Sequence, residues 1–139
     1  MLQVASWAQG VSSGNSGCCM SIGTAMCHIL IIEDEPFVAM NIQLLFEDEG
    51  VTSFEIASTE AEAVAAAMDR RPDLITSDVR LLEGTGPRAV AEIFARLGHV
   101  PVIFITGTPS ECVPAPASAL ILSKPLQRGA LEAAFRQLR

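Results

Sequence analysis

Residues 29–36 have the sequence ILIIEDEP, in which four branched aliphatic residues are followed at once by three carboxylates. A short aliphatic run is typical of a buried strand, and Pro36 is suited to the first turn of a helix. Glu33, Asp34 and Glu35 repel one another, which raises the free energy of the folded state unless a positive charge offsets the repulsion. The stretch therefore predicts a strand, a helix, and a cation that meets the carboxylates between them.

The same order of strand and helix recurs along the rest of the chain. Short aliphatic strands are predicted at 28–33, 53–57, 73–77, 101–105 and 119–122. Helices are predicted at 36–49, from Thr59 onward, at 87–97 and at 126–138. Five strands that alternate with helices indicate the α/β class, with a doubly wound, five-stranded parallel sheet and helices on both faces.

The first two helices have apolar faces suited to packing. The second helix starts with a capping box, Thr59 and Glu62, and its core-facing side is predicted to consist of Ala61, Val64, Ala65 and Met68. The first helix has two apolar stripes, one with Val38, Ile42, Leu45 and Phe46 and the other with Phe37, Met40 and Leu44. The core needs one stripe, so the other is either a docking surface for a partner or part of a wider buried face.

Length and composition narrow the class of protein. A chain of 139 residues is enough for one domain with a substantial core. A net charge of −7 argues against a nucleic-acid surface, and no apolar run approaches the length of a membrane span. Residues 1–26 lack the pattern of a secretory signal and are predicted to be a flexible extension of a folded domain at 27–139. A cytoplasmic location follows as the expectation.

The chain contains four cysteines, Cys18, Cys19, Cys27 and Cys112, and no CxxC pair. A metal site built from the first three of these and His28 would match none of the usual zinc spacings. The preferred interpretation is that the thiols are reduced and unconnected. The two histidines are also expected to be structural.

Polar residues follow four of the five predicted strands, namely Glu33 and Asp34, Asp78, Thr106 and Lys124. Ligands of open parallel sheets bind at the carboxyl ends of the strands, so these side chains are expected at one edge. The three carboxylates form an oxygen-rich site suited to Mg²⁺. Lys124 and Thr106 are each able to contact a phosphoryl oxygen, and Asp78 is a candidate nucleophile.

Each of these residues also has a purely structural interpretation. Carboxylates stabilise a helix N-terminus, Asp78 and Thr106 are ordinary loop formers, and Lys124 could be a lone surface lysine. The functional interpretation is preferred because all of them converge on the same edge of the sheet.

From about residue 27 to 138 the chain resembles a two-component response-regulator receiver domain. The matching motifs are Glu33-Asp34, Asp78 in DLITSDVRLLEGTG, Thr106 in VIFITG and Lys124-Pro125 in LILSKP. The resemblance implies the strand order 2-1-3-4-5. It also implies that Asp34 and Asp78 bind Mg²⁺ directly, with Glu33 acting through water and the backbone carbonyl of Arg80 completing the protein ligands.

The same resemblance implies a phosphoryl-transfer role. Asp78 would accept a phosphoryl group from a histidine kinase or a histidine phosphotransfer protein. This makes the apolar stripe of the first helix that the core does not need a candidate docking surface for that donor. Thr106 would donate a hydrogen bond to the phosphoryl group and Lys124 would pair with it. The Lys124–Pro125 peptide bond resembles one that is usually cis in receivers.

The sequence departs from the usual receiver pattern at four positions near the site. Leu82 replaces a common proline, Gly107 a common alanine, and Ile121 the tyrosine or phenylalanine that often reports phosphorylation. Some stress-pathway receivers instead carry an aromatic residue at the position of Thr108. We therefore hypothesise that the segment 109–118, whose three prolines allow only a short or broken helix, carries the signal.

Three functions are compatible with the sequence. The first is a stand-alone response regulator that acts by binding proteins, since the sequence ends directly after the last predicted helix. The second is a degenerate receiver that binds its partner constitutively, which Leu82 and Ile121 favour. The third is a phosphohydrolase with an aspartyl-phosphate intermediate, which is disfavoured because the first strand is not followed by the D-x-D motif of many such enzymes. A nucleotide-binding protein is weaker still, since no glycine-rich turn follows that strand.

Overall fold

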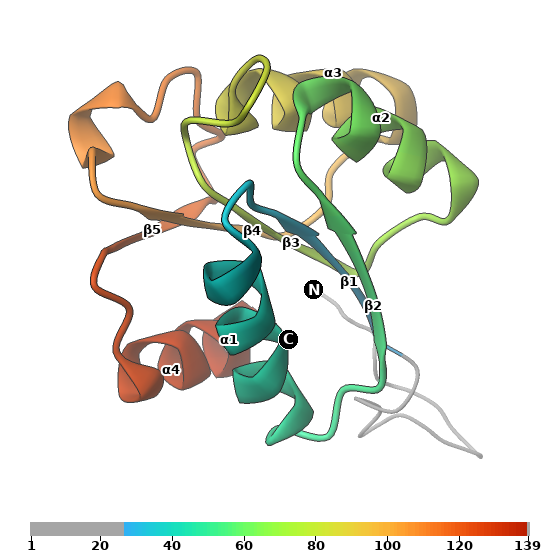
Figure 1. Ribbon diagram of the computed structural model, residues 1–139. Helices are drawn as coiled ribbons and strands as arrows, with labels where there is room; N and C mark the ends of the chain where they lie inside the picture. Colours follow the sequence, from blue (N-terminus) through green and yellow to red (C-terminus); the bar gives the residue numbers. More distant parts are fainter. Residues whose placement is uncertain (1–26, 139) are drawn as a thin grey trace.

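The computed structural model describes residues 27–138, which form a three-layer α/β fold (Figure 1). The predicted extension at 1–26, with Cys18 and Cys19, lies outside the described residues. The strands are β1 (His28–Ile32), β2 (Ser53–Ala57), β3 (Leu74–Ser77), β4 (Val102–Thr106) and β5 (Leu120–Ser123). They pair in parallel in the order β2-β1-β3-β4-β5, which confirms the predicted fold class and strand order.

Helices cover both faces of the sheet, and Figure 1 shows α1 and α4 on one face and α2 and α3 on the other. Their bounds are α1 (Pro36–Glu47), α2 (Glu60–Asp69), α3 (Gly86–Leu97) and α4 (Arg128–Leu138). Between β4 and β5 the structure has only the single 3₁₀ turn η2 (Pro109–Glu111). The prolines of this segment remove backbone donors and prevent a longer helix, as the sequence predicted. No helix within residues 27–138 combines the length and apolar character needed to cross a membrane.

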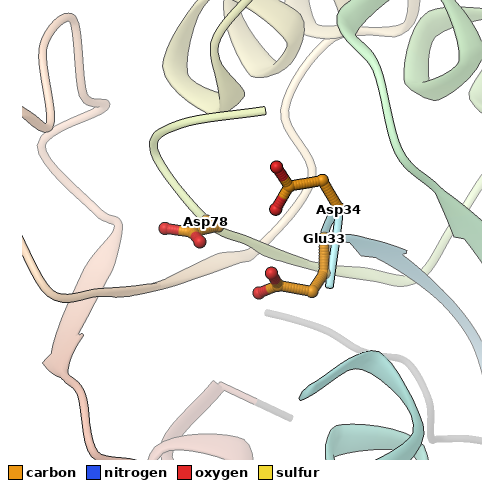
Figure 2. Close-up of side chains that lie close together, drawn as sticks. All are labelled: Glu33, Asp34 and Asp78. Carbon is orange, nitrogen blue, oxygen red and sulfur yellow. The ribbon is translucent and has the colours of Figure 1, made fainter. Parts of the chain in front are cut away.

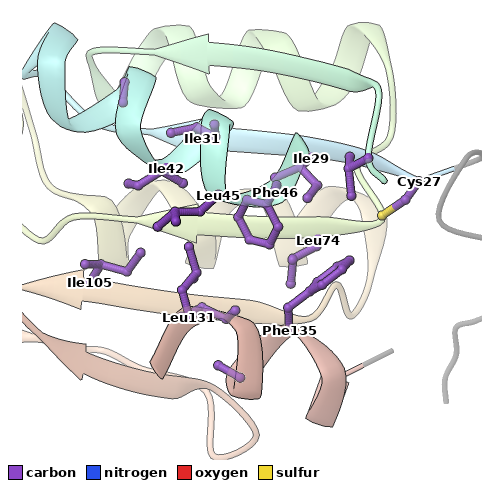
Figure 3. Close-up of a cluster of buried hydrophobic side chains, with 14 residues drawn as sticks. Cys27, Ile29, Ile31, Ile42, Leu45, Phe46, Leu74, Ile105, Leu131 and Phe135 are labelled. Atoms are coloured by element: carbon purple, nitrogen blue, oxygen red, sulfur yellow. The ribbon is translucent and has the colours of Figure 1, made fainter. Parts of the chain in front are cut away.

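The alternation of side chains along the strands creates two separate cores. Ile29 and Ile31 of β1 face α1 and α4, where the rings of Phe46 and Phe135 meet edge to face with centroids 5.0 Å apart (Figure 3). Leu30 and Ile32 of the same strand face the other way, toward α2 and α3. Because both faces of β1 are buried, every residue of this strand is apolar or has a specific polar partner.

Of the two predictions made for α2, its N-terminal cap and its packed face, the first is confirmed and the second is wrong. Thr59 caps α2 as expected, with its hydroxyl accepting from the Glu62 amide at 3.1 Å. The predicted core face of α2 is wrong: Ala63 and Ala67 are buried, whereas Ala61, Ala65 and Met68 are exposed and Val64 is half-buried. Alanine lies on several sides of this helix, so apolar spacing alone does not select the side that packs on the sheet.

In α1 only one of the two apolar stripes enters the core. Ile42, Leu45 and Phe46 are buried, together with Ala39, and Val38 is partly buried against the same core. The second stripe faces solvent, with Phe37 83%, Met40 58% and Leu44 53% exposed. The alternative of a single wider buried face is therefore wrong, and α1 presents an apolar surface that the fold itself does not use.

At the amino ends of the strands, both the backbone amide and the ring of His28 have a hydrogen-bond partner. The His28 amide donates to Asp73 Oδ2 at 2.7 Å, and His28 Nδ1 lies 2.7 Å from Ser53 Oγ. Burial, followed by the charge of Arg70, lowers the pKa of His28, which favours the neutral form of the ring. Nearby, Arg71 donates to the carbonyl oxygens of Leu97 and His99 at 2.6 and 2.9 Å, which closes the end of α3.

Candidate functional site: an acidic cluster with a lysine

The carboxylates that follow β1 and β3 gather at the opposite edge of the sheet. Glu33, Asp34 and Asp78 each offer one carboxylate oxygen within 4.8 Å of the others, as Figure 2 shows for the two neighbouring strand ends. Glu33 is buried, whereas Asp34 and Asp78 are half-buried. Three hard oxygen donors with a partly open side fit Mg²⁺, which keeps several waters and takes few protein carboxylates.

Lys124 reaches this cluster from the end of β5. Its ammonium donates to Asp78 Oδ2 at 2.8 Å and to Glu33 Oε1 at 3.3 Å. The backbone holds it there, because the Lys124 amide donates to the carbonyl oxygen of Thr106 at 2.9 Å. The Lys124–Pro125 peptide bond is cis, as the family resemblance implied.

The Lys124 ammonium offsets only part of the negative charge of the three carboxylates. Glu33, which is expected to act on a metal through water, is buried, and its carboxylate contacts Lys124 directly. Three carboxylates face one ammonium, which leaves an excess of two negative charges if all are ionised. A divalent cation would neutralise that excess.

The electrostatics of the pair Glu33 and Lys124 reflect burial and mutual attraction. Burial raises the pKa of Glu33 to about 7; the Glu35 amide and the Lys124 ammonium oppose this effect, and the charge of Asp78 adds to it. For Lys124, burial alone would lower the pKa, but the hydrogen bond to Asp78 and the charges of Glu33 and Asp78 outweigh it. The pKa of Lys124 is therefore raised. The site holds a firmly charged lysine beside a carboxyl that is close to its titration point at neutral pH.

Asp78 is held by its own loop. Its Oδ1 accepts from the Val79 amide at 2.6 Å, and its carbonyl oxygen accepts from the Ser77 hydroxyl at 2.8 Å. The first residue of α3 packs directly on this loop, since a Cβ at Gly86 would collide with the Asp78 carbonyl and the Ser77 hydroxyl. Glycine is therefore required at position 86, where its lack of a side chain lets the start of α3 approach the site.

Thr106 and Arg80 lie near the cluster but have other partners. The Thr106 hydroxyl accepts from the Thr108 amide at 2.9 Å and lies 3.2 Å from the Thr108 hydroxyl. Among the hydrogen bonds of residues 27–138, none joins Thr106 to Asp78. The Arg80 backbone pairs with Thr85, and its guanidinium binds Glu111.

Sequence reasoning missed two of these contacts. Glu111 lies in a proline-rich segment without periodicity, so no pattern indicated that its side chain would reach the loop after β3. The contact of Thr108 with Thr106 has a recognisable signal, because a threonine hydroxyl often accepts from the amide two residues later.

The fold and the site together define a receiver domain. The family model of the response regulator receiver domain matches residues 29–136, and the chain belongs to this family of two-component signalling. It is similar to the phyllosphere-induced regulator PhyR of Methylorubrum extorquens, with 37% identity over 112 residues. That match covers 78% of this chain and 42% of PhyR, so the chain spans less than half the length of this relative.

Two solved structures extend the comparison. The receiver domain of PhyR from Erythrobacter litoralis has a TM-score of 0.72 and 30% identity, over 80% of this chain and 88% of that one. The receiver domain of the sensor histidine kinase PA1611 from Pseudomonas aeruginosa has a TM-score of 0.71 and 28% identity. That comparison covers 80% of this chain and 95% of the other, whose active-site cleft holds a magnesium ion.

Proposed function

We propose that Asp78 accepts a phosphoryl group from a phosphohistidine protein and that Asp34 and Asp78 bind the Mg²⁺ that this transfer requires. Glu33 acts on the metal through water, and the backbone carbonyl of Arg80 is a further ligand. The observation that carries the proposal is the 2.8 Å contact between the Lys124 ammonium and Asp78 inside a cluster of three carboxylates. Membership of the receiver family and the magnesium ion in the related PA1611 domain support the same assignment.

The chemistry follows from these positions. An oxygen of the Asp78 carboxylate forms a bond to phosphorus as the bond from phosphorus to the histidine nitrogen breaks, and the electron pair stays with the imidazole. When bound, Mg²⁺ neutralises charge on the transferring group. Lys124 pairs with a phosphoryl oxygen, which requires it to share or release its contact with Asp78. Thr106 donates to the phosphoryl group after its hydroxyl leaves Thr108.

The donor protein requires a docking surface close to the site. The exposed stripe Phe37, Met40 and Leu44 starts one turn after the acidic pair Glu33-Asp34, on the helix that leads away from it. An apolar helix face of this kind suits packing against the helices of a histidine kinase or a phosphotransfer protein. We assign this surface to the phosphohistidine donor.

Labelling with a small phosphodonor tests the assignment. Incubation with acetyl phosphate and Mg²⁺ should add one phosphoryl group per chain, measured by intact mass, and Asp78→Asn or removal of the metal with EDTA should reduce labelling to background. Asp69→Asn, at the exposed end of α2, is the matched control and should label normally. Labelling that persists in Asp78→Asn would refute the role of this residue.

A second candidate is a receiver that binds its partner without phosphorylation. The observation in its favour is the Thr106 hydroxyl, which is engaged by Thr108, together with the exposed Leu82 and Ile121 at positions where receivers carry other residues. Absence of labelling in the wild-type protein would favour this module. Repeated hydrolysis of a phosphomonoester by each chain would instead favour an enzyme.

A further inference from the structure

A bidentate ion pair links the two loops that flank the candidate phosphorylation site. Arg80 Nε donates to Glu111 Oε1 at 2.9 Å, and Arg80 Nη2 donates to Glu111 Oε2 at 2.8 Å. Arg80 lies two residues after Asp78, and Glu111 lies in η2, five residues after Thr106. The pair therefore joins the loop after β3 to the loop after β4, next to the residues that would bind the phosphoryl group.

An exposed ion pair usually contributes little to stability, and these side chains are 72% and 45% exposed. The pair of Arg80 and Glu111 differs from a typical surface ion pair because it connects the loop after β3 to the segment 108–119. Apart from the Thr108 amide, which donates to the Thr106 hydroxyl, the backbone amides of this segment donate within it, for example from Cys112 to Pro109 and from Ala119 to Pro116.

Three side chains of the segment 108–119 hydrogen-bond to other elements of the described chain, and one of them is Thr108, whose hydroxyl lies 3.2 Å from that of Thr106 in β4. Ser118 contacts His99 at 3.0 Å, far from the site, and Glu111 binds Arg80 beside it. Thr108 ties the start of this segment to β4, and Glu111 ties its η2 turn to the loop after β3.

Phosphorylation of Asp78 would create a stronger partner for Arg80. A phosphoryl group carries a charge of about −1.5 to −2 at pH 7 and three acceptor oxygens, whereas Glu111 offers one negative charge. Guanidinium groups bind phosphoryl oxygens through the same forked geometry that they use with carboxylates. The Arg80 side chain is mostly exposed, so it is free to reorient without disturbing the core.

We propose that Glu111 binds Arg80 in the unphosphorylated chain and that the phosphoryl group on Asp78 competes with Glu111 for the Arg80 guanidinium. Loss of the ion pair then releases residues 108–113. Glu111 is thus a positioning residue for Arg80 and couples the site to this segment. The inference rests on the proposed function, because it requires phosphorylation at Asp78. It gives the segment a route to report phosphorylation that needs no aromatic residue at Ile121.

A double-mutant cycle tests the competition. The probe is beryllium fluoride with Mg²⁺, a mimic of the phosphoryl group, and its affinity is measured by titration calorimetry. Glu111→Gln should tighten binding by roughly two- to fivefold, the range expected of an exposed ion pair, and Arg80→Gln should weaken it. In the Arg80→Gln background, Glu111→Gln should have no further effect, because no guanidinium remains to be released.

A matched control removes a similar ion pair elsewhere. Glu92 accepts from Arg96 at 2.7 Å on the exposed face of α3, and Glu92→Gln should leave the affinity for beryllium fluoride unchanged. Equal tightening by Glu111→Gln with and without Arg80 would indicate a general charge effect and would overturn the proposal.

Hydrogen exchange provides the structural readout. Amides 108–113 of free Glu111→Gln should exchange as fast as those of the wild-type protein bound to beryllium fluoride. If the wild-type protein does not bind the mimic, the proposed function fails and the competition fails with it. If it binds, but free Glu111→Gln retains wild-type protection at 108–113, only the role of Glu111 is refuted.

Discussion

The two ends of the parallel sheet differ in how far their charged and polar groups have partners within the fold. At the amino end, His28 has Ser53 and Asp73 as partners, and the effect of burial on Asp73, which raises its pKa, is opposed by the His28 amide and by the charges of His28, Arg70 and Arg71. At the carboxyl end, three carboxylates share one ammonium, and Glu33 is buried despite its negative charge. The first arrangement stabilises the fold, whereas the second costs stability in the absence of a cation and prepares a site for one.

The largest expected difference between the two ends is in their response to pH. The pKa of Glu33 in the folded protein, about 7, lies above its ordinary value of 4.5. Its contribution to the free energy of unfolding is therefore fully present below pH 4.5 and is lost as the pH rises through 7. In metal-free protein this loss should reach at most about 3 kcal/mol, measured by urea denaturation between pH 5 and 8 in EDTA.

Glu33→Gln is the variant that isolates this effect, because it removes the titrating group and keeps its shape. Its stability should not decline over the same pH range. His28 at the amino end should act in the opposite sense, since its lowered pKa gives stability that is present above pH 6.5 and is lost as the pH falls. A decline with rising pH that is identical in Glu33→Gln would show that Glu33 is not its source.

A second prediction concerns a carboxylate at the amino end. Asp73→Ala leaves the His28 amide without its side-chain acceptor, so the free energy of unfolding should fall by about 1 kcal/mol. The rate of labelling by acetyl phosphate should be unchanged, because this residue lies at the opposite edge from Asp78. Normal stability of Asp73→Ala, or a large loss of its labelling, would contradict the prediction that the amino end serves the fold and not the site.

The smallest expected change in stability comes from the carboxyl end and has the opposite sign. Asp34→Asn removes one of three mutually repelling carboxylates, so metal-free protein should become more stable by about 0.5 kcal/mol. The affinity for Mg²⁺, measured by calorimetry, should fall at least about tenfold, because a ligand charge is lost. Destabilisation by this variant would mean that Asp34 serves the fold.

Much of the architecture could be predicted from the sequence because strand, turn and charge signals agree. The run Ile29 to Ile32 is apolar on both faces, which specifies a central strand, and each polar site residue lies at the end of a strand or within two residues of it. The packed side of α2 could not be predicted, since alanine is nearly as compatible with one side of a helix as with another. The Thr108 amide was by contrast a predictable partner of the Thr106 hydroxyl, because a threonine hydroxyl often accepts from the amide two residues later.

Contacts between segments far apart in the chain were the hardest to foresee. Arg80 and Glu111 are both common surface residues, and only the path of the loop after β4 brings them together. The direct contact of Lys124 with Glu33 was missed for a related reason. The sequence predicts which strand ends meet, but it does not specify which of several carboxylates a long flexible side chain will choose.

The glycine at position 86 has a mechanical consequence. The start of α3 rests on the Asp78 backbone with no side chain between them, and its end is fastened by Arg71 through Leu97 and His99. Because both ends of α3 are held in this way, we expect this helix to keep its position if the loop that contains Asp78 is displaced. Any such displacement should instead move the proline-rich connection between β4 and β5, which contains only the short η2 turn.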